Sequence, residues 1–419
     1  MAARVIVIGQ GYVGLPLAMR AVDVGFDVVG LDLDERKIGG LRLGRSHIDD
    51  VTDADISRAL ETGRYRPSSS YGDVDSFDIA VITVPTPLRD GVPDLSYIEG
   101  AVESIGEYLV AGCTVILEST TYPGTTDELV APRLAAISGL KAGVDFHVGF
   151  SPERIDPGNE VWNFVRTPKV VSGLTPESLE AVQAFYNRLV ERTVPVSTTR
   201  AAELTKLLEN TFRHVNIALV NELAMHARAL GIDIWEVIEA ASSKPFGFTA
   251  FWPGPGVGGH CLPIDPSYLS WKIEQQLGVT SRFVDMANDI NNHMPAYVVR
   301  RVQLGLNRRR KAVNGARVLV LGLSYKKNSN DARETPSTAV IAGLLELGAE
   351  VWVADSHVGP HPIDDIAERV VLDRRRLEES DAVIIVTDHD DVDYDLVASA
   401  SSYVFDARNR ATGMSVEPL

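Results

Sequence analysis

The sequence is poor in cysteine, basic residues and long apolar runs, and each shortage excludes a class of protein. Its 419 residues include two cysteines, Cys113 and Cys261, which are too few for a disulfide framework, and no CxxC pair or histidine-rich cluster indicates zinc. Lys and Arg number 40 against 57 Asp and Glu, and the net charge of −17 argues against a general nucleic-acid binder. No apolar run approaches the roughly 18 residues of a membrane span, and Val5–Ile8 is too short for a signal peptide. We therefore expect a soluble, cytoplasmic protein.

Short apolar runs alternate with helical patterns over the first two hundred residues, a rhythm that predicts a parallel sheet covered on both faces. The expected strands there are Arg4–Ile8, Asp27–Leu31, Asp78–Val84, Cys113–Glu118, His147–Phe150 and Lys169–Ser172. From Arg200 to Ala241 the pattern is helical throughout, and a second long helix is expected at Ser281–Asn307, after a loop rich in Gly and Pro. The alternation then restarts, with expected strands Arg317–Leu321, Glu350–Ala354, Ala382–Thr387 and Tyr403–Asp406.

This organisation predicts an α/β protein in which two doubly wound, Rossmann-like domains are joined by a long-helix connector. The expected domains are 1–199, 200–311 and 312–419. A long connector helix must bury a second apolar flank, so we expect the connector to form the core of a homodimer. The two α/β domains share a rhythm but no close sequence repeat.

A dinucleotide site is predicted where the first strand ends. Gly9-Gln10-Gly11-Tyr12-Val13-Gly14 forms a GxGxxG pattern between a strand and a helix, in which the glycines allow a tight turn, close approach of a pyrophosphate and helix–strand packing. Asp32 follows the second strand, where its carboxylate can accept hydrogen bonds from both ribose hydroxyls and repel a 2′-phosphate, which favours NAD over NADP. The second α/β domain opens without a GxGxxG and is a poor candidate for a second NAD. Its Lys326, Lys327 and Arg333 can instead meet phosphate groups.

Cys261 is the candidate nucleophile. It lies in the Gly/Pro-rich segment Gly258–Pro266, where Pro263 suits the first turn of a helix, and a thiol at a helix N-terminus ionises more easily. Asp265, four residues on, would share its helical face. His260 is a neighbour in sequence and is not favoured as its base. Cys113 lies within an expected strand and fits a small buried apolar residue.

Further polar residues are candidates for the same chemistry. Lys206 and Asn210 lie four apart on one face of the connector helix and can donate hydrogen bonds to a developing oxyanion, although a solvated helical lysine is an equally ordinary interpretation from spacing alone. Thr120 and Glu153 each follow an expected strand, and therefore lie at the carboxyl edge of the sheet, where doubly wound folds bind ligands.

Together these residues resemble the nucleotide-sugar 6-dehydrogenases over essentially the full chain. The matching segments are Gly9–Gly14, Val84-Pro85-Thr86-Pro87, Ser119–Thr126, Ser151-Pro152-Glu153-Arg154, Lys206–Asn221, Gly254–Pro266, Asn328–Pro336 and Asp406-Ala407-Arg408. The resemblance implies an NAD-dependent four-electron oxidation of the sugar C6, in which Cys261 holds a thiohemiacetal and then a thioester that water hydrolyses to the uronate. By position, Lys206 and Asn210 would stabilise the oxyanion, Thr120 and Asp265 would hold the water, and Glu153 would assist hydrolysis.

The resemblance also implies which residues meet each ligand and that no metal takes part. The implied NAD contacts are Gly9, Gly11, Tyr12, Val13, Gly14, Asp32, Lys37, Val84, Pro85, Thr86, Thr120 and Arg333. The implied contacts with the nucleotide sugar are Glu153, Arg154, Lys206, Asn210, Lys244, Phe251, Gly254, Gly258 and Lys326, with Lys244 the basic residue placed to complete the site of a partner chain.

Two departures bear on the substrate. UDP-glucose dehydrogenases usually have Lys before the Asp that follows the nucleophile, and a second Glu four residues after the first; this chain has Ile264 and Pro157. Both look more like the UDP-N-acetylhexosamine branch, and UDP-glucose and a dTDP-hexose stay open. Two other functions are possible: a two-electron 3-hydroxyacid or sugar-acid dehydrogenase, whose chemistry has no task for Cys261, and a nucleotide-sugar-binding protein without turnover.

Overall fold

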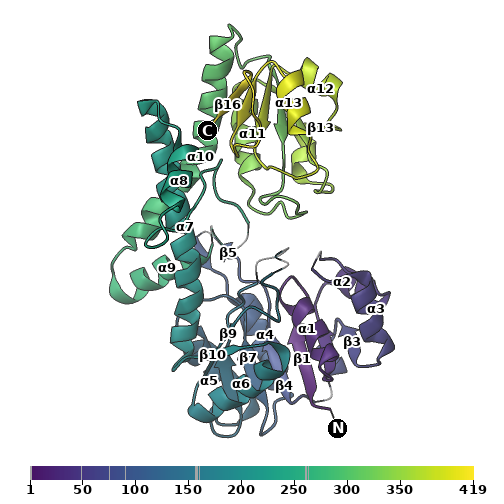
Figure 1. Cartoon of the computed structure of the whole chain (residues 1–419). Coiled ribbons are helices and arrows are strands. Elements are labelled where there is room, and N and C mark those ends of the chain that lie inside the picture. The colour runs from purple at the N-terminus through teal and green to yellow at the C-terminus, as the bar shows by residue number, and fades with distance from the viewer. Residues whose placement is uncertain are drawn as a thin grey trace. The chain divides into compact units, whose positions relative to one another are not determined.

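The computed structural model describes residues 2–48, 50–74, 76–89, 91–155, 159, 161–259, 262 and 264–419. It divides into two compact units, Met1–Glu209 and Asn210–Leu419. The 32-residue helix α7 (Thr199–Leu230) runs across the boundary between them (Figure 1). Within the described ranges, every helix is too short or too polar to span a lipid bilayer.

The first unit is built on an eight-stranded sheet with the order β10-β9-β8-β7-β4-β1-β2-β3. Its strands pair in parallel except where β9 runs antiparallel to β8. The strands are β1 (Arg4–Ile8), β2 (Asp27–Leu31), β3 (Tyr65–Ser68), β4 (Ile79–Ile82), β7 (Thr114–Leu117), β8 (His147–Phe150), β9 (Lys169–Gly173) and β10 (Thr193–Pro195); a separate hairpin joins β5 (Leu88–Arg89) to β6 (Val92–Pro93).

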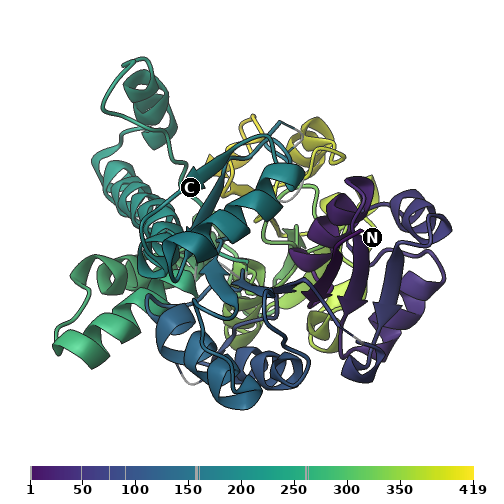
Figure 2. The same cartoon turned by 90° about the horizontal axis from the view of Figure 1, so that it is seen from below.

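Helices cover both faces of this sheet (Figure 2). Alternate residues of β1 enter different cores: Val5 and Val7 pack in one cluster, Ile6 and Ile8 in the other. Since successive side chains of a strand point to opposite faces, the sheet separates two apolar layers. The helical segments are α1 (Gly14–Asp23), α2 (Glu35–Arg42), α3 (Asp53–Glu61), η1 (Tyr71–Asp73), α4 (Ser96–Gly106), η2 (Thr126–Val130), α5 (Ala131–Ser138) and α6 (Pro176–Leu189).

The second unit contains a six-stranded parallel sheet with the order β13-β12-β11-β14-β15-β16. The strands are β11 (Arg317–Leu321), β12 (Glu350–Ala354), β13 (Glu368–Arg369), β14 (Ala382–Ile385), β15 (Val404–Asp406) and β16 (Val416–Pro418), and the helices are α8 (Ile234–Ser242), α9 (Asp265–Leu277), α10 (Arg282–Arg308), α11 (Pro336–Glu346), η3 (Pro362–Asp365), α12 (Arg374–Glu379) and α13 (Tyr394–Ala400). This sheet has the same strand order as β3-β2-β1-β4-β7-β8 of the first unit, which is the order of dinucleotide-binding folds. The prediction of two doubly wound α/β sheets with a helical segment between them is confirmed.

One expectation needs correction. The expected continuous helical stretch Arg200–Ala241 is broken, because α7 ends at Leu230 and α8 begins at Ile234. Gly231 takes a left-handed conformation (φ 73°) and the Asp233 side chain accepts a hydrogen bond from the Trp235 amide, so the sequence supplies both a stop and a new start. The helix after the Cys261 loop begins at Asp265 and has Pro266 in its first turn, while Pro263, which was expected in that turn, lies outside the described residues.

Candidate active site

The glycine-rich turn between β1 and α1 has little room for side chains. Gly9 has φ 95°, and a Cβ there would lie 2.7 Å from the carbonyl oxygen of Thr83; a Cβ on Gly14 would overlap the carbonyl oxygen of Gly9. A Cβ on Gly11, in contrast, would meet nothing within 4 Å. The turn therefore needs glycine at its two packed positions and faces open space at the middle one. This arrangement fits a pyrophosphate at the N-terminus of α1, where Val13 is the N-cap residue.

Asp32 sits beside this turn, directly after β2. Its Oδ2 accepts hydrogen bonds from the backbone amide of Gln10 (2.9 Å) and from Nζ of Lys37 (3.3 Å), and its Oδ1 accepts one from the amide of Asp34 (2.9 Å). The carboxylate is thus fixed against the glycine turn with Lys37 next to it. That is the position from which a carboxylate reads the ribose of a dinucleotide.

The segment after β4 closes the other side of the turn, where the strand order of the sheet reverses between β1 and β4. The Thr83 hydroxyl donates to the carbonyl oxygens of Ile8 (2.9 Å) and Gly9 (2.8 Å), and the Ser119 hydroxyl donates to that of Val84 (2.8 Å). Predicted NAD contacts gather at this edge: Tyr12, Val84 and Thr120 are half-buried, Thr86 is buried and Pro85 is exposed.

Glu153, predicted as a catalytic carboxylate, lies at the same edge of the sheet, three residues after β8. It is buried, its Oε1 accepts hydrogen bonds from the amides of Arg154 (2.6 Å) and Ile155, and its Oε2 lies 3.4 Å from Nζ of Lys169. Lys169 also forms a buried ion pair with Glu118. The pairing of these groups was not foreseen in the sequence, where the only signal is a charged residue at the end of one apolar strand and at the start of another.

Arg154 and Lys206 differ in whether their charged groups are paired. The Arg154 guanidinium is already engaged, since it donates to Glu209 (2.6 Å) and to the carbonyl oxygen of Pro168 (2.7 Å). Lys206 is 9% exposed, and no carboxylate of the described residues pairs with its ammonium. Because a buried lysine normally has an anionic partner, Lys206 has the environment expected of a residue that meets a ligand.

Glu203, one turn before Lys206 on α7, ties the helix to the loop that follows Thr120. Its carboxylate accepts hydrogen bonds from the amides of Gly124 (2.6 Å) and Thr126 (2.9 Å) and from the Thr126 hydroxyl (2.7 Å). Burial raises the pKa of Glu203 to about 7, although these hydrogen bonds oppose the shift. This residue holds the edge loop in place and was also missed in the sequence.

In the second unit, the described residues of the predicted catalytic set are Asn210 and Asp265. Nδ2 of Asn210 donates to Oδ2 of Asp265 at 2.5 Å, and Asp265 is 2% exposed in the first turn of α9. The structure therefore brings together two residues that lie 55 positions apart. Cys261, the predicted nucleophile, lies outside the described residues, as do His260, Pro263 and Pro157. Cys113 is buried and its thiol donates to the carbonyl oxygen of Phe77 (2.9 Å), as expected of a structural cysteine.

Four predicted substrate contacts precede α9. Lys244 is exposed, with its Nζ 5.0 Å from the Phe246 ring centre, while Phe251 packs edge-on against Phe212. Gly254 donates its amide to Oδ1 of Asn221 (2.9 Å), and a Cβ on it would lie 2.7 Å from the Arg408 guanidinium. A Cβ on Gly258 would meet the Tyr325 side chain at 2.7 Å. Gly258 is therefore needed for close packing within this unit, because a Cβ there would also lie 2.8 Å from the backbone oxygen of Glu334.

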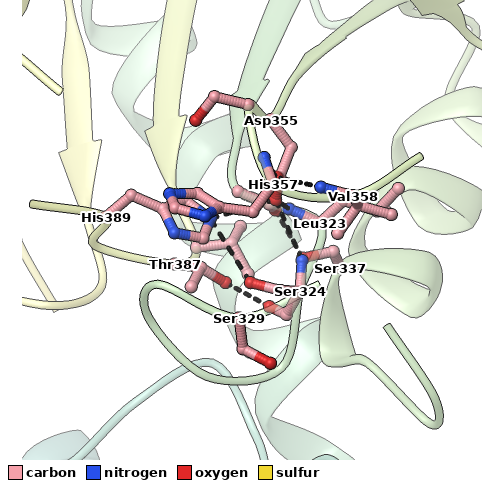
Figure 3. Close-up of polar contacts among 12 residues, drawn as sticks. Leu323, Ser324, Ser329, Ser337, Asp355, His357, Val358, Thr387 and His389 are labelled. Carbon is pink, nitrogen blue, oxygen red and sulfur yellow. Dashed lines mark hydrogen bonds and ion pairs between the residues drawn. The ribbon is translucent and has the colours of Figure 1, made fainter. Parts of the chain in front are cut away.

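The second sheet repeats the crossover of the first, with one difference. Gly322 follows β11 with φ 91°, and a Cβ on it would overlap Thr387, just as Gly9 packs on Thr83. The Asp355 side chain, however, points into the turn after β11. Its Oδ2 accepts hydrogen bonds from the amides of Leu323 (2.6 Å) and Ser324 (3.0 Å) and from Nε2 of His389 (3.0 Å) (Figure 3).

The Asp355 carboxylate is also held from its own side. Oδ1 accepts from the amides of His357 (2.8 Å) and Val358 (2.9 Å), and the side chain is fully buried. Burial alone would raise its pKa, but the hydrogen bonds from His389 and the amides keep the pKa of Asp355 well below its usual range. A protein carboxylate therefore takes two amides of this turn, whereas Asp32 takes only that of Gln10 in the turn of the first unit.

His389 fixes the loop that carries Lys326. Its Nδ1 accepts from the amide of Asn328 (2.9 Å), so its Nε2 carries the proton given to Asp355. His357 and Asp391 bring further ligand-type atoms within 4.8 Å of His389, but both nitrogens of His389 are already engaged. Lys326 is half-buried, and the Arg333 guanidinium pairs with Asp331 (2.5 Å). Contact of Arg333 with NAD stays a prediction.

Comparison with known proteins identifies one family over most of the chain. Three models of the UDP-glucose/GDP-mannose dehydrogenase family match: the NAD binding domain at residues 3–190, the central domain at 200–293 and the UDP binding domain at 319–412. The chain is 40% identical over 359 residues to the UDP-N-acetyl-D-glucosamine 6-dehydrogenase of Pseudomonas aeruginosa, covering 85% of this chain and 83% of the relative.

It is also 35% identical over 388 residues to the UDP-N-acetyl-D-mannosamine dehydrogenase of Pyrococcus horikoshii, covering 92% of this chain and 89% of the relative. Among solved structures, the UDP-D-ManNAc dehydrogenase from Pyrococcus horikoshii superposes with a TM-score of 0.90 at 32% identity, over 99% of this chain and 98% of that one.

Proposed function

Because the chain belongs to the UDP-glucose/GDP-mannose dehydrogenase family, and is thus an NAD-dependent nucleotide-sugar dehydrogenase, we propose that it oxidises the C6 hydroxymethyl group of a UDP-N-acetylhexosamine to a carboxylate. The observation that carries the choice of substrate is the match to enzymes named for UDP-N-acetylglucosamine and UDP-N-acetylmannosamine over most of both chains. Ile264 and Pro157, where UDP-glucose enzymes carry Lys and Glu, point the same way.

The cofactor is held by the turn between β1 and α1. The N–H groups at the start of α1 and the open face of Gly11 would receive the pyrophosphate, and Asp32 would accept the ribose hydroxyls. When bound, NAD takes up the hydride that leaves C6 in each of the two oxidations. The protein orients the alcohol and handles the protons.

Cys261 carries the covalent steps. Its thiolate adds to the C6 aldehyde to give a thiohemiacetal, which loses a hydride and a proton to become a thioester. Water then adds to the thioester carbon, the C–S bond breaks, and the uronate leaves with the thiolate restored. Lys206 and Asn210 donate to the oxyanion, Thr120 and Asp265 hold the water, and Glu153 accepts its proton.

Two observations support these roles. A cation that is buried with no carboxylate partner among the described residues, as Lys206 is, favours a ligand that develops negative charge. The short hydrogen bond from Asn210 to Asp265 restrains rotation of the Asn210 side chain. The amide and the carboxylate can therefore act at one place, at the start of α9.

The proposal includes the rest of the assembly. In the second α/β domain, Lys326 would contact the sugar nucleotide, and Arg333 would reach the cofactor. The chain would form a homodimer through the apolar face of α7, with Lys244 completing the site of the partner. A cytoplasmic location is part of the same proposal, and the three-domain division 1–199, 200–311 and 312–419 is retained in it.

One assay tests the proposal against its alternatives. Absorbance at 340 nm is followed with NAD over a panel of UDP-N-acetylhexosamines, UDP-glucose and dTDP-glucose. Two NADH per sugar are expected with a UDP-N-acetylhexosamine, whereas one NADH would indicate a two-electron dehydrogenase, and sugar-nucleotide binding with no NADH would indicate a binding protein. A clear preference for UDP-glucose would overturn the substrate class alone.

The thiol is tested in the same assay. Cys261→Ser keeps the shape of the residue but removes the good nucleophile and leaving group, so uronate formation should fall by orders of magnitude. Cys113→Ser is the matched control: it should cost about 1–3 kcal/mol of stability for an altered buried group and leave the chemistry intact. Uronate formation by Cys261→Ser at the wild-type rate would rule out the thioester.

A further inference from the structure

A buried charge cluster lies next to Glu153 at the carboxyl edge of the first sheet. It consists of Glu118, which follows β7, Lys169, the first residue of β9, and Glu153 itself, and Tyr186 of α6 packs against it. The Glu118 side chain is fully buried, and those of Lys169 and Glu153 are 5% and 11% exposed. Charged side chains are seldom buried this deeply, and removing one partner of such a set leaves an uncompensated charge.

Lys169 lies between the two carboxylates. Its ammonium donates to Oε1 of Glu118, reaches Oε2 of Glu153 at 3.4 Å and lies 5.3 Å from the ring centre of Tyr186. The other oxygen of Glu153 is held by the amides of Arg154 and Ile155. Glu153 is thus fixed through both oxygens, by the backbone on one side and by Lys169 on the other. Among the described residues, Oε2 of Glu118 has no hydrogen-bond partner.

The cluster has one cation for two carboxylates, so it binds a proton readily. Burial raises the pKa of Glu118 to about 7; Lys169 opposes this shift and the charge of Glu153 adds to it. Burial alone would lower the pKa of Lys169, but the two carboxylates raise it above its usual value, so the ammonium stays charged. Glu118 therefore gains and loses a proton near neutral pH, and in its ionised form it offsets part of the charge of Lys169.

We propose that Lys169 and Glu118 are positioning residues for Glu153. Lys169 keeps that carboxylate charged and oriented, and Glu118 holds the Lys169 ammonium in place and offsets part of its charge. This inference rests on the proposed role of Glu153 in thioester hydrolysis. In that step one O–H bond of water breaks and its proton goes to Glu153. The water oxygen bonds to the thioester carbon, and the C–S bond breaks to leave the uronate and the Cys261 thiolate.

The two positioning residues act on Glu153 with opposite sign. Lys169 places a positive charge 3.4 Å from Oε2 of Glu153, whereas an ionised Glu118 offsets part of that charge. The other titratable groups beside Glu153 in the described chain do not compete for this role. Burial raises the pKa of Tyr186 well above its usual value, so its hydroxyl stays neutral, and the Arg154 guanidinium is paired with Glu209.

The experiment compares the pH dependence of hydrolysis in Lys169→Met, Glu118→Gln and Lys169→Arg. Burst formation of NADH reports the oxidation steps, and quenched-flow measurement of uronate reports hydrolysis. A general base works when it is deprotonated, so hydrolysis should rise with pH along an acidic limb. Lys169→Met should move this acidic limb up by about one pH unit or more, and Glu118→Gln should move it down, while the NADH burst stays near the wild-type rate. Lys169→Arg keeps the charge and should restore the wild-type limb.

A matched control separates this from lost stability. Glu417 in the second unit is also a buried carboxylate, 10% exposed and paired with Arg301 (2.7 Å), so Glu417→Gln should lower the melting temperature and leave the limb in place. The inference would be overturned if the acidic limbs of Lys169→Met and Glu118→Gln moved in the same direction, or if neither moved. The proposed function would stand in both cases as long as the wild-type enzyme makes two NADH per uronate. If Lys169→Met does not fold, an unmoved limb in Glu118→Gln overturns the inference. Absence of NADH in the wild type would overturn the proposed function instead.

Discussion

Under the proposed function Asp32 would accept the ribose hydroxyls of NAD, and in the structure it pairs with Lys37 at 3.3 Å. Asp32→Ala should therefore raise the KM for NAD by about 10- to 100-fold, roughly 1.4–2.7 kcal/mol. It should also relax discrimination against NADP, since the freed Lys37 ammonium can meet a 2′-phosphate. Steady-state kinetics with both cofactors measure the two effects.

Asp34 provides the control for this substitution. It lies two residues away and caps α2 by accepting a hydrogen bond from the Arg36 amide (2.9 Å), so Asp34→Ala should weaken the helix without changing the NAD to NADP ratio. Unchanged NAD kinetics in Asp32→Ala would remove Asp32 from the cofactor site.

At the residue scale, the sequence indicates the groups whose position follows from local pattern. Gly9, Gly14 and Asp32 belong to one strand–turn–helix–strand unit, and their geometry is the one the spacing predicts. The pair Lys169 and Glu118 is 51 residues apart, and Arg154 meets Glu209 across 55 residues. No periodicity specifies such pairs, because they form only when the strands are ordered in the sheet.

At the scale of elements, the crossover from β11 to β12 depends on Asp355. All five groups that contact its oxygens are hydrogen-bond donors, three at Oδ2 and two at Oδ1. Asp355→Asn would place an NH₂ group against at least two of them, and should cost about 3 kcal/mol of unfolding free energy. Urea unfolding at neutral pH measures this loss.

Asp391 is the matched control at the same edge of the sheet. It is 50% exposed and accepts from the Ser356 hydroxyl (2.6 Å), so Asp391→Asn should change stability by no more than about 0.5 kcal/mol. Equal stability of Asp355→Asn and the wild type would show that the amides of this turn are satisfied without the charge.

The elements themselves were predictable where a pattern is long or strongly apolar. The strand Glu350–Ala354 and the long helix near Arg282–Arg308 agree with expectation to within a residue. The edge strands β3, β10, β13 and β16 were missed, because each has two to four residues and includes proline or charged side chains. Short edge strands are defined by their neighbour in the sheet and carry little pattern of their own.

At the scale of the whole molecule, α7 presents apolar side chains to solvent at intervals of four or seven residues: Leu204, Leu208, Phe212, Leu219 and Leu223 are 43–63% exposed. Such a stripe is typical of a helix that pairs with another surface. We expect the wild-type protein to sediment as a dimer at micromolar concentration. The double variant Leu219→Glu/Leu223→Glu should sediment as a monomer, because two buried charges per helix would oppose association.

Val371→Glu is the control for this experiment, since Val371 is 83% exposed and lies in the second sheet domain and not on α7. It should leave the dimer unchanged. A wild-type protein that sediments as a monomer would contradict the assignment of α7 as an interface.

The turn after β11 has a consequence for the order of events in catalysis. Of the two described crossovers of this kind, the first has one amide held by Asp32 and the second has two held by Asp355, and the GxGxxG pattern belongs to the first alone. Under the proposed chemistry, each chain must therefore exchange its cofactor at a single turn between the first oxidation and the second. During that exchange the half-oxidised sugar has to be retained, and a covalent bond to Cys261 holds it where a reversible complex would let it escape.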